Sequence, residues 1–421
     1  MEPLTLDAFE LASNKVKEVT LKTELVYSDI FSDRTGAKVY LKPENMQRTG
    51  AYKVRGAYYK ISTMSPEDRA KGLITASAGN HAQGVAYAAR KFGVPAIIVM
   101  PVTTPYIKVS RTQNLGAQVV LHGDVYDESC EYAIKLAEEK GYTFIHPFDN
   151  PDVATGQGSI AMEIIQELPL ADVILVPVGG GGLATGVSTL AKLLKPNLQV
   201  IGVEPEGAAC LTESFKAGHV VTVPHVNTIA DGTAVQTPGS HIFPYLQKNL
   251  DRVVTVPDEE LVEAFLDMVE NHKMIVENSG LLSVAALKHL SKPAIAGNGK
   301  EVPGIDIKGK RVVCVLSGGN MDVITMSSVV RQGLIMRDRI FTVSVLLPDR
   351  PGELQRVAEI IAKQNGNVIK LEHNQFASIN RNAAVELVIT MEAFGSDHKK
   401  QIINALTEAG FKPQLRRTKS E

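Results

Sequence analysis

Short runs of β-branched and aliphatic residues alternate with helical segments from residue 37 to about residue 316. Six such runs lie at 73–75, 96–100, 118–121, 173–178, 200–203 and 312–316, and the segments at 81–92, 126–140 and 158–167 between them have helical patterns. Apolar strands separated by helices are typical of parallel sheets covered on both faces. The alternation therefore predicts an α/β architecture, and the Pro-, Gly- and Lys-rich stretch at 291–310 predicts a surface loop before the last core strand.

Four consecutive glycines directly follow the apolar run at 173–178 and precede a helical stretch at 183–191. Because glycine has no Cβ, several main-chain N–H groups can converge on one phosphate, and a helix N-terminus adds partial positive charge. The loop has neither the G-x-G-x-x-G nor the G-x-x-x-x-G-K-[ST] pattern of nucleotide sites. It therefore predicts a site for a smaller phosphorylated cofactor.

Lys53 lies between small residues and an aromatic ring, in the stretch GAYKVRGA at 50–57, where a helix is expected to begin. A lysine with small neighbours can approach a cofactor closely enough for covalent attachment. Most lysines are solvated surface residues, so this stretch taken alone favours a surface location.

Two further polar segments follow predicted strands. The stretch SAGNHAQG at 77–84 offers N–H groups, a hydroxyl and an amide to a carboxylate at a helix N-terminus, although alone it is also compatible with a plain serine N-cap. The stretch SGGN at 317–320 is, by itself, compatible with a simple tight turn. Ligands of open α/β sheets bind at the carboxyl ends of strands, so the two glycine loops are candidates to face one crevice.

Taken together, these motifs resemble those of fold-type II pyridoxal-phosphate (PLP) enzymes, specifically the threonine dehydratases (threonine ammonia-lyases) of the serine/threonine dehydratase family. The resemblance covers essentially the whole chain. It implies a tryptophan synthase β-like catalytic domain with two parallel-sheet subdomains, followed by an α+β ACT domain. It also implies PLP as cofactor and conversion of L-threonine to 2-oxobutanoate and ammonia, with L-serine giving pyruvate.

The resemblance implies that Lys53 binds PLP covalently and later removes the Cα proton. It places the ring of Tyr52 over the pyridine, Asn80 on the 3-hydroxyl oxygen and Ser317 at the pyridine nitrogen, where a poor proton donor favours elimination over transamination. The full set of implied cofactor contacts is Lys53, Tyr52, Asn80, Gly179, Gly180, Gly181, Gly182, Leu183, Gly232, Glu277 and Ser317. The substrate carboxylate is expected at Ser77, Gly79, Asn80 and His81.

Three alternatives bear on this interpretation. Serine racemases resemble the chain but carry a second serine where Ala78 stands, so the missing hydroxyl favours elimination here. Other β-eliminating or β-replacing PLP enzymes also remain open.

Related enzymes bind a divalent ion near the position of Glu204. In this chain Cys210 replaces one of the carboxylate ligands, so no divalent metal site is expected, and a monovalent ion stays open. A non-catalytic amino-acid sensor would be expected to lack Lys53 or the glycine loop.

The chain is expected to divide into a catalytic domain at 1–330, with a small subdomain inserted at about 50–150, a linker at 331–340 and an ACT-like regulatory domain at 341–421. The last domain has the pattern βαββαβ, with its third strand at 384–391. The resemblance implies a small effector, such as isoleucine or a nucleotide, at Pro351, Gly352, Leu354, Asn367, Val368 and Ile369. The alternative is that this domain binds no effector and serves only to join subunits. For the whole protein, the resemblance suggests a homotetramer.

Composition limits the partners further. Of the 421 residues, 44% are apolar and 21% charged, and the net charge of −2 gives no electrostatic reason to expect nucleic acid or an anionic membrane. The three cysteines form no C-x-x-C pair, the N-terminus lacks a signal-peptide pattern, and no apolar run approaches membrane-spanning length. We therefore expect a cytoplasmic enzyme that acts on a small amino acid.

Overall fold

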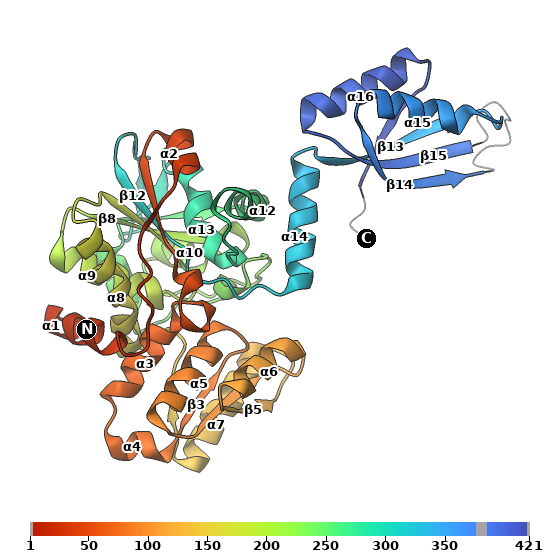
Figure 1. The fold of residues 1–421 in the computed structure, drawn as a ribbon. Coiled ribbons are helices and arrows are strands. Elements are labelled where there is room, and N and C mark those ends of the chain that lie inside the picture. The colour runs from red at the N-terminus through yellow and green to blue at the C-terminus, as the bar shows by residue number, and fades with distance from the viewer. Residues whose placement is uncertain (1–2, 376–384, 419–421) are drawn as a thin grey trace. The chain divides into compact units, whose positions relative to one another are not determined.

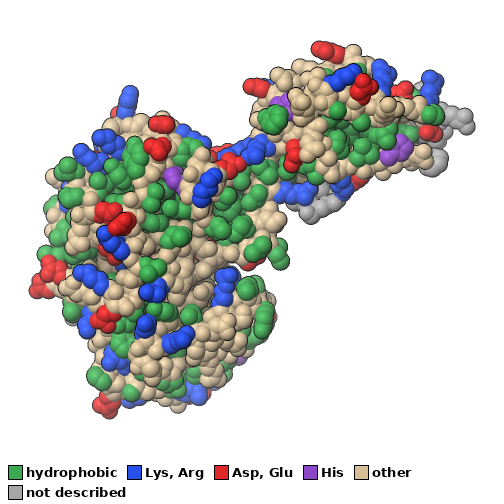
Figure 2. All heavy atoms as spheres, in the orientation of Figure 1, with side chains coloured by type: hydrophobic (Ala, Val, Ile, Leu, Met, Phe, Trp, Pro, Cys, Tyr) green, Lys and Arg blue, Asp and Glu red, His purple; other side chains and the backbone are tan. Residues whose placement is uncertain are grey.

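The computed structural model describes residues 3–375 and 385–418. The chain divides into two compact units, Met1–Met321 and Asp322–Glu421. The catalytic boundary at 330 stays a prediction. Figure 2 shows acidic and basic side chains interspersed over the visible face, as the near-neutral net charge implies.

The first unit contains an eight-stranded sheet with the order β1-β2-β12-β7-β8-β9-β10-β11. The five strands from β2 to β9 pair in parallel, and the edge strands pair antiparallel. The strands are β1 (Val26–Tyr27), β2 (Lys38–Lys42), β7 (Val173–Pro177), β8 (Gln199–Pro205), β9 (Arg252–Val256), β10 (Ala294–Ile295), β11 (Glu301–Val302) and β12 (Arg311–Val315). The short hairpin β10–β11 lies in the stretch at 291–310 expected to be a surface loop. The sequence does not indicate these strands, because two residues are too few to show an alternation of apolar and polar side chains.

A second sheet of the same unit has the order β5-β4-β3-β6, and all of its strands are parallel. Its strands are β3 (Leu73–Ala76), β4 (Ala96–Met100), β5 (Gln118–Leu121) and β6 (Thr143–Phe144). The helices α3 (Lys53–Thr63), α4 (Pro66–Lys71), α5 (Asn80–Phe92), α6 (Tyr106–Asn114) and α7 (Tyr126–Lys140) accompany it (Figure 1). The parallel sheets predicted from the alternation are thus confirmed.

The larger sheet packs against helices whose first residues are typical of helix N-termini. Helix α8 begins at Pro151 and is capped by Asn150, whose side chain accepts hydrogen bonds from the N–H groups of Asp152 and Val153. Ile160 of α8 and Val187 of α9 belong to the same buried core. The helices are α1 (Leu6–Val16), α2 (Asp29–Thr35), α8 (Pro151–Glu167), α9 (Gly182–Leu194), α10 (Cys210–Ala217), α11 (Phe243–Asn249), α12 (Asp258–Asp267) and α13 (Asn278–Ala285). Within the described part of the chain, no helix has the length and apolar character needed to cross a bilayer.

The second unit begins with α14 (Val323–Met336) and continues with an antiparallel sheet of order β14-β15-β13-β16. Its other elements are β13 (Ile340–Leu347), α15 (Glu353–Lys363), β14 (Asn367–Asn374), β15 (Val385–Glu392), α16 (Ser396–Glu408) and β16 (Gln414–Arg416). Figure 1 shows α15 and α16 on one face of this sheet. The predicted order βαββαβ is confirmed; Ala384, expected to begin the third strand, lies outside the described residues.

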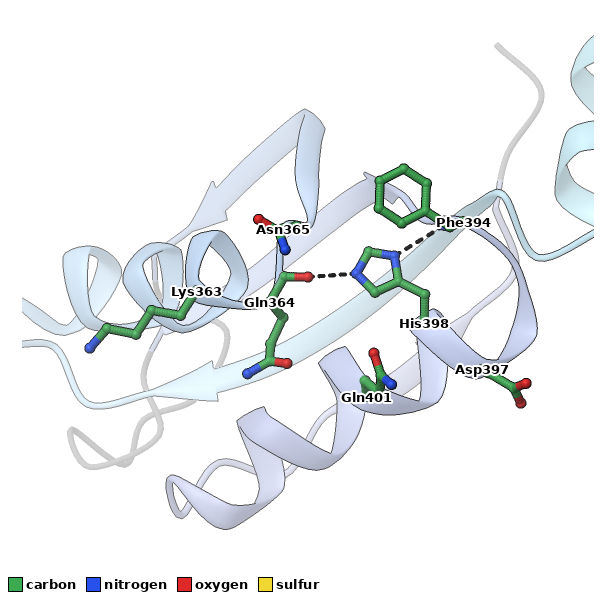
Figure 3. Close-up of a pocket in the computed structure, with 7 residues that line it drawn as sticks. All are labelled: Lys363, Gln364, Asn365, Phe394, Asp397, His398 and Gln401. Carbon is green, nitrogen blue, oxygen red and sulfur yellow. Dashed lines mark hydrogen bonds between the residues drawn. The ribbon is translucent and has the colours of Figure 1, made fainter.

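A hollow of about 400 Å³ lies between the end of α15 and the start of α16 (Figure 3). His398 Nε2 donates to the carbonyl of Gln364 at 2.5 Å, and its Nδ1 accepts from the main-chain N–H of Phe394 at 3.0 Å. The rings of Phe394 and His398 are stacked, with their centroids 4.8 Å apart. Because both ring nitrogens have fixed partners, His398 joins the two helices as one neutral tautomer.

Candidate active site

The segment before Lys53 is joined to the end of strand β12. Ala51 forms an antiparallel bridge with Gly318, and the Tyr52 N–H donates to the carbonyl of Ser317 at 3.1 Å. Thr49 has a left-handed backbone with φ of 62°, an uncommon conformation for a β-branched residue. Helix α3 then begins at Lys53. The lysine and the strand-end SGGN loop, far apart in the sequence, therefore occupy one place in the fold.

The side chain of Lys53 is half-buried. Its Nζ donates to the main-chain carbonyl of Pro147 at 2.8 Å and lies 5.4 Å from the centre of the Tyr52 ring. Burial lowers the pKa of Lys53 to about 8, an effect that the nearby Glu277 carboxylate opposes. A half-buried amine with a pKa near 8 is neutral in a larger fraction at physiological pH than an ordinary lysine, which suits it to act as a nucleophile and as a base.

Helix α3 is held by a buried network of opposite charges. Arg55 donates to Glu44 at 2.8 Å and to Glu163 at 2.6 Å, and Lys42 donates to Glu163 at 2.6 Å. Although burial favours the protonated acid, Arg55 and Lys42 together lower the pKa of Glu163. The network links α3 to strand β2 and helix α8, and so fixes the helix that carries Lys53.

The glycine loop lies where β7 ends and α9 begins, and Gly181 has a φ of 98°. A Cβ at Gly180 would lie 2.3 Å from the ring of Phe148, and one at Gly182 would lie 2.9 Å from the Phe148 carbonyl oxygen. The first N–H groups of an α-helix have no intrahelical partner. The exposed main-chain N–H groups of the loop are therefore suited to bind a phosphate. The loop lies against Phe148, the residue directly after Pro147.

The expected carboxylate-binding segment lies where β3 ends and α5 begins. Ser77 Oγ accepts from the N–H of Gly79 at 3.2 Å, and α5 begins at Asn80. His81 Nε2 donates to the carbonyl of Ile145 at 3.0 Å, while burial lowers the pKa of His81 to about 3. The neutral imidazole has no remaining N–H, so only the main-chain N–H of His81 suits a carboxylate.

Asn80 belongs to a closed ring of polar groups. Its Nδ2 donates to Glu277 Oε1 at 2.7 Å, and its Oδ1 accepts from Asn320 Nδ2 at 2.8 Å. The main-chain N–H of Asn320 favours the charged form of the Glu277 carboxylate. Burial raises the pKa of Glu277 to about 7, although these hydrogen bonds oppose the shift. Glu277 thus holds or releases a proton near neutral pH.

Two more expected cofactor residues adjoin these groups. Ser317 is buried directly after the last core strand, and the Cβ position of Gly232 lies 3.5 Å from Glu277 Oε1. The Cβ position of Gly179 lies 2.8 Å from the Cα of Thr233, which brings the glycine loop next to Gly232. The expected cofactor residues thus come together from separate segments, and a half-buried amine beside the glycine loop fits PLP.

Sequence reasoning missed three residues of this site. Asn320 stood in the SGGN motif but received no role, and Pro147 and Phe148 belong to no motif. Nothing in the sequence signals that the carbonyl of Pro147 meets the lysine, because the two residues are 94 positions apart.

Glu204 lies apart from the polar ring and is fully buried. It accepts hydrogen bonds from the N–H groups of Leu211 and Thr212 and from the Thr212 hydroxyl, at 2.7, 2.8 and 2.7 Å. Burial raises its pKa to about 7. Over residues 3–375 and 385–418, no group of three or more His, Cys, Asp or Glu side chains is arranged to hold a metal ion.

The effector residues expected in the second unit lie at its surface. Gly352 precedes α15 with a φ of 95°, and Leu354 is 38% exposed. Asn367 donates to Glu392 at 2.8 Å, and Ile369 is 49% exposed at an irregularity of strand β14. Against the described residues of the chain, all six expected positions are exposed: Pro351, Gly352, Leu354, Asn367, Val368 and Ile369.

Comparison with known proteins gives the following matches. The family described as pyridoxal-phosphate dependent enzyme matches residues 16–318. An L-threonine ammonia-lyase of Thermotoga maritima is 40% identical over 412 residues, which are 98% of this chain and 99% of that protein. The structure of the processed form of threonine deaminase isoform 2 from Solanum lycopersicum has a TM-score of 0.71 and 37% identity, covering 79% of this chain and 90% of that one. Maize serine racemase has a TM-score of 0.71 and 30% identity, covering 77% of this chain and 98% of that one.

Proposed function

The chain belongs to the pyridoxal-phosphate dependent enzyme family, and we propose that it uses PLP to convert L-threonine to 2-oxobutanoate and ammonia. Relatives named for threonine deamination match nearly the whole chain. The observation that carries the proposal is the half-buried amine of Lys53, which lies beside the glycine loop. L-Serine, which lacks one methyl group, is a second substrate because an apolar pocket discriminates by only about 1–3 kcal/mol per methylene.

PLP, when bound, supplies the electron sink that makes the Cα–H bond of the amino acid acidic. Lys53 would hold the cofactor through its side-chain amine, and as a free amine it would take the proton from Cα. The main-chain N–H groups of Gly180 to Gly182 hold the phosphate, and Ser77, Gly79 and the N–H of His81 orient the substrate carboxylate. The Cα proton and the β-hydroxyl are lost together as water, and the C–O bond breaks as the Cα–Cβ double bond forms. The resulting enamine takes a proton from water to become an imine, which a second water hydrolyses to the 2-oxo acid and ammonia.

Serine racemisation is the second candidate, favoured by the similarity to maize serine racemase. A racemase needs a proton donor on the face of Cα opposite Lys53. Ala78 precedes Gly79 in the carboxylate-binding segment and has no exchangeable proton. The absence of this hydroxyl supports elimination as the main reaction.

The second unit is proposed to regulate the first. Gly352, Leu354 and Ile369 are exposed and are the positions at which an ACT-like unit would bind isoleucine or a nucleotide. We further propose that such units pair and that the protein is a homotetramer acting in the cytoplasm. Light scattering of the purified full chain measures the assembly.

The deciding experiment measures products from L-threonine, L-serine and O-acetylserine with PLP present, each with and without isoleucine and AMP. We expect 2-oxobutanoate from threonine and a smaller yield of pyruvate from serine. Absence of any 2-oxo acid from both would overturn the dehydratase assignment. More racemised serine than pyruvate would establish the second candidate, and rates unchanged by either effector would contradict regulation by these two compounds.

A further inference from the structure

Asn320 uses both hydrogens of its side-chain NH₂ at the candidate active site. This Nδ2 donates to the carbonyl of Thr49 at 2.6 Å and to Asn80 Oδ1 at 2.8 Å. On the basis of the proposed function, we infer that Asn320 is a positioning residue, which fixes the direction of the Asn80 amide towards Glu277 and the cofactor.

The direction of both amides follows from the partner of Asn320. A main-chain carbonyl can only accept, so the group of Asn320 that meets the Thr49 oxygen is the NH₂. The second hydrogen of that NH₂ is donated to Asn80, which must therefore present its oxygen to Asn320. The NH₂ of Asn80 is consequently the end that lies 2.7 Å from Glu277. One main-chain acceptor thus determines the orientation of two side chains.

Glycines make room for this arrangement. A Cβ at Gly50 would lie 2.5 Å from Asn320 Oδ1, and one at Gly318 would lie 2.3 Å from Glu277 Oε1 and 3.0 Å from Asn80 Nδ2. Cβ atoms do not approach other atoms so closely, and the ring of Asn320, Asn80 and Glu277 closes because both positions lack a side chain. The bond to the carbonyl of Thr49 also holds that residue in its left-handed conformation.

The opposite orientation of Asn80 would damage the site in two ways. Its oxygen would face the ionised form of Glu277 and repel it, and the hydrogen bond from the Asn80 NH₂ to Glu277 would be lost. Asn320 prevents this orientation through its hydrogen bonds to Thr49 and Asn80. Loss of its donors should therefore affect cofactor binding through Asn80.

The test replaces Asn320 by Asp, which has nearly the same shape but no side-chain N–H. PLP affinity is measured by titration of the apoprotein, together with the absorption spectrum of the bound cofactor, kcat and the KM for L-threonine. We expect PLP affinity to fall about tenfold or more, the size of losing one hydrogen bond to a charged group, and the spectrum to shift. The matched control is Asn45→Asp, which also removes a buried amide donor to a main-chain carbonyl, that of Ile275, but has no link to Asn80.

A double-mutant cycle separates positioning from a general structural effect. If Asn320 acts through Asn80, Asn80→Ala combined with Asn320→Ala should weaken PLP binding no more than Asn80→Ala alone. Additive losses, or a folded Asn320→Asp protein with wild-type PLP affinity and spectrum, would overturn the inference. Failure of the wild-type protein to bind PLP or to form 2-oxobutanoate would instead refute the proposed function.

Discussion

The amine of Lys53 and the main-chain carbonyl of Pro147 are joined by a hydrogen bond of 2.8 Å. The next residue, Phe148, lies against the glycine loop, where its ring occupies the space that a side chain at Gly180 would need. Two consecutive residues thus border both the nucleophilic amine and the phosphate cradle. Their position sets the separation between the two ends of the cofactor site.

Replacing Lys53 by Ala should abolish covalent PLP attachment and lower the rate of 2-oxobutanoate formation by about 10²–10⁴-fold or more, because both the anchor and the base are lost. Intact-mass analysis after borohydride reduction and a coupled product assay measure the two effects. The control is Lys60→Ala on the same helix, since Lys60 pairs with Asp152 outside the site. A Lys53→Ala protein that still carries reducible PLP would refute the assignment.

The rate at which the apoprotein captures PLP should rise with pH, pass half of its maximum near pH 8 and level off above about pH 9. Burial lowers the pKa of Lys53 to about 8, so the fraction of neutral, nucleophilic amine grows as pH rises through that value. An ordinary lysine would continue to gain reactivity up to about pH 10.4. Stopped-flow absorbance at several pH values measures the rate of PLP capture. A rate that still rises at pH 10 would contradict a lowered pKa of Lys53.

Gly180→Ala should weaken PLP binding, because the new methyl group would lie 2.3 Å from the Phe148 ring and must displace either the loop or the ring. Removing the ring in the double variant Gly180→Ala with Phe148→Ala should restore part of the affinity. Phe148→Ala alone supplies the reference for the cost of the missing ring. Equal affinities of the single Gly180 variant and the double variant would show that the clash is not the cause.

Arg55→Met should destabilise the fold by about 3–5 kcal/mol, because Glu44 and Glu163 would be left buried without their main cation. Urea unfolding monitored by circular dichroism measures the change. Lys216→Ala, which removes an exposed pair with Glu213, is the control and should change little. A destabilisation no larger than that of the control would show that the network contributes nothing to stability.

The wild-type protein should lose stability in acid, because the ion pairs of Glu163 with Arg55 and Lys42 require an ionised carboxylate. The pKa of Glu163 is lowered in the folded state, so its ionised form stabilises the fold above the unfolded pKa, and this contribution disappears as pH falls through the folded value. Unfolding curves at a series of pH values below 5 measure the slope, which should be shallower in Glu163→Gln. An unchanged slope would assign acid unfolding to other carboxylates.

Ala78→Ser should give measurable D-serine from L-serine, because it adds a hydroxyl to the carboxylate-binding segment where the racemases carry one. Ala78 is half-buried beside Gly79, which has open space at its Cβ position. Chiral chromatography measures the ratio of D-serine to pyruvate in the variant and in wild type. An unchanged ratio would mean that the missing hydroxyl does not decide between elimination and racemisation.

Much of the architecture could be predicted from residue patterns. The strands β4 and β7 are buried and apolar along their length, and β3, β8 and β12 have buried, mainly apolar runs. Such runs are typical of parallel strands, and the structure confirms them. The two-residue strands β10 and β11 could not be predicted, because they exist only through pairing with each other and with β9. The roles assigned to single site residues stay predictions.

The sequence alone determined the glycine loop as a phosphate site, because bare main chain at a strand end is a property of residue type that neighbouring residues reveal. The family and PLP followed from the resemblance of the motifs taken together. Only the tertiary structure decided that the carbonyl of Pro147 meets Lys53 and that Asn320 directs the amide of Asn80. The second pair is separated by 240 positions, and no local pattern encodes which atoms of such distant segments meet. Hydrogen-bond direction depends on the atoms that packing brings together, so it emerges only when the two sheets and their loops are assembled.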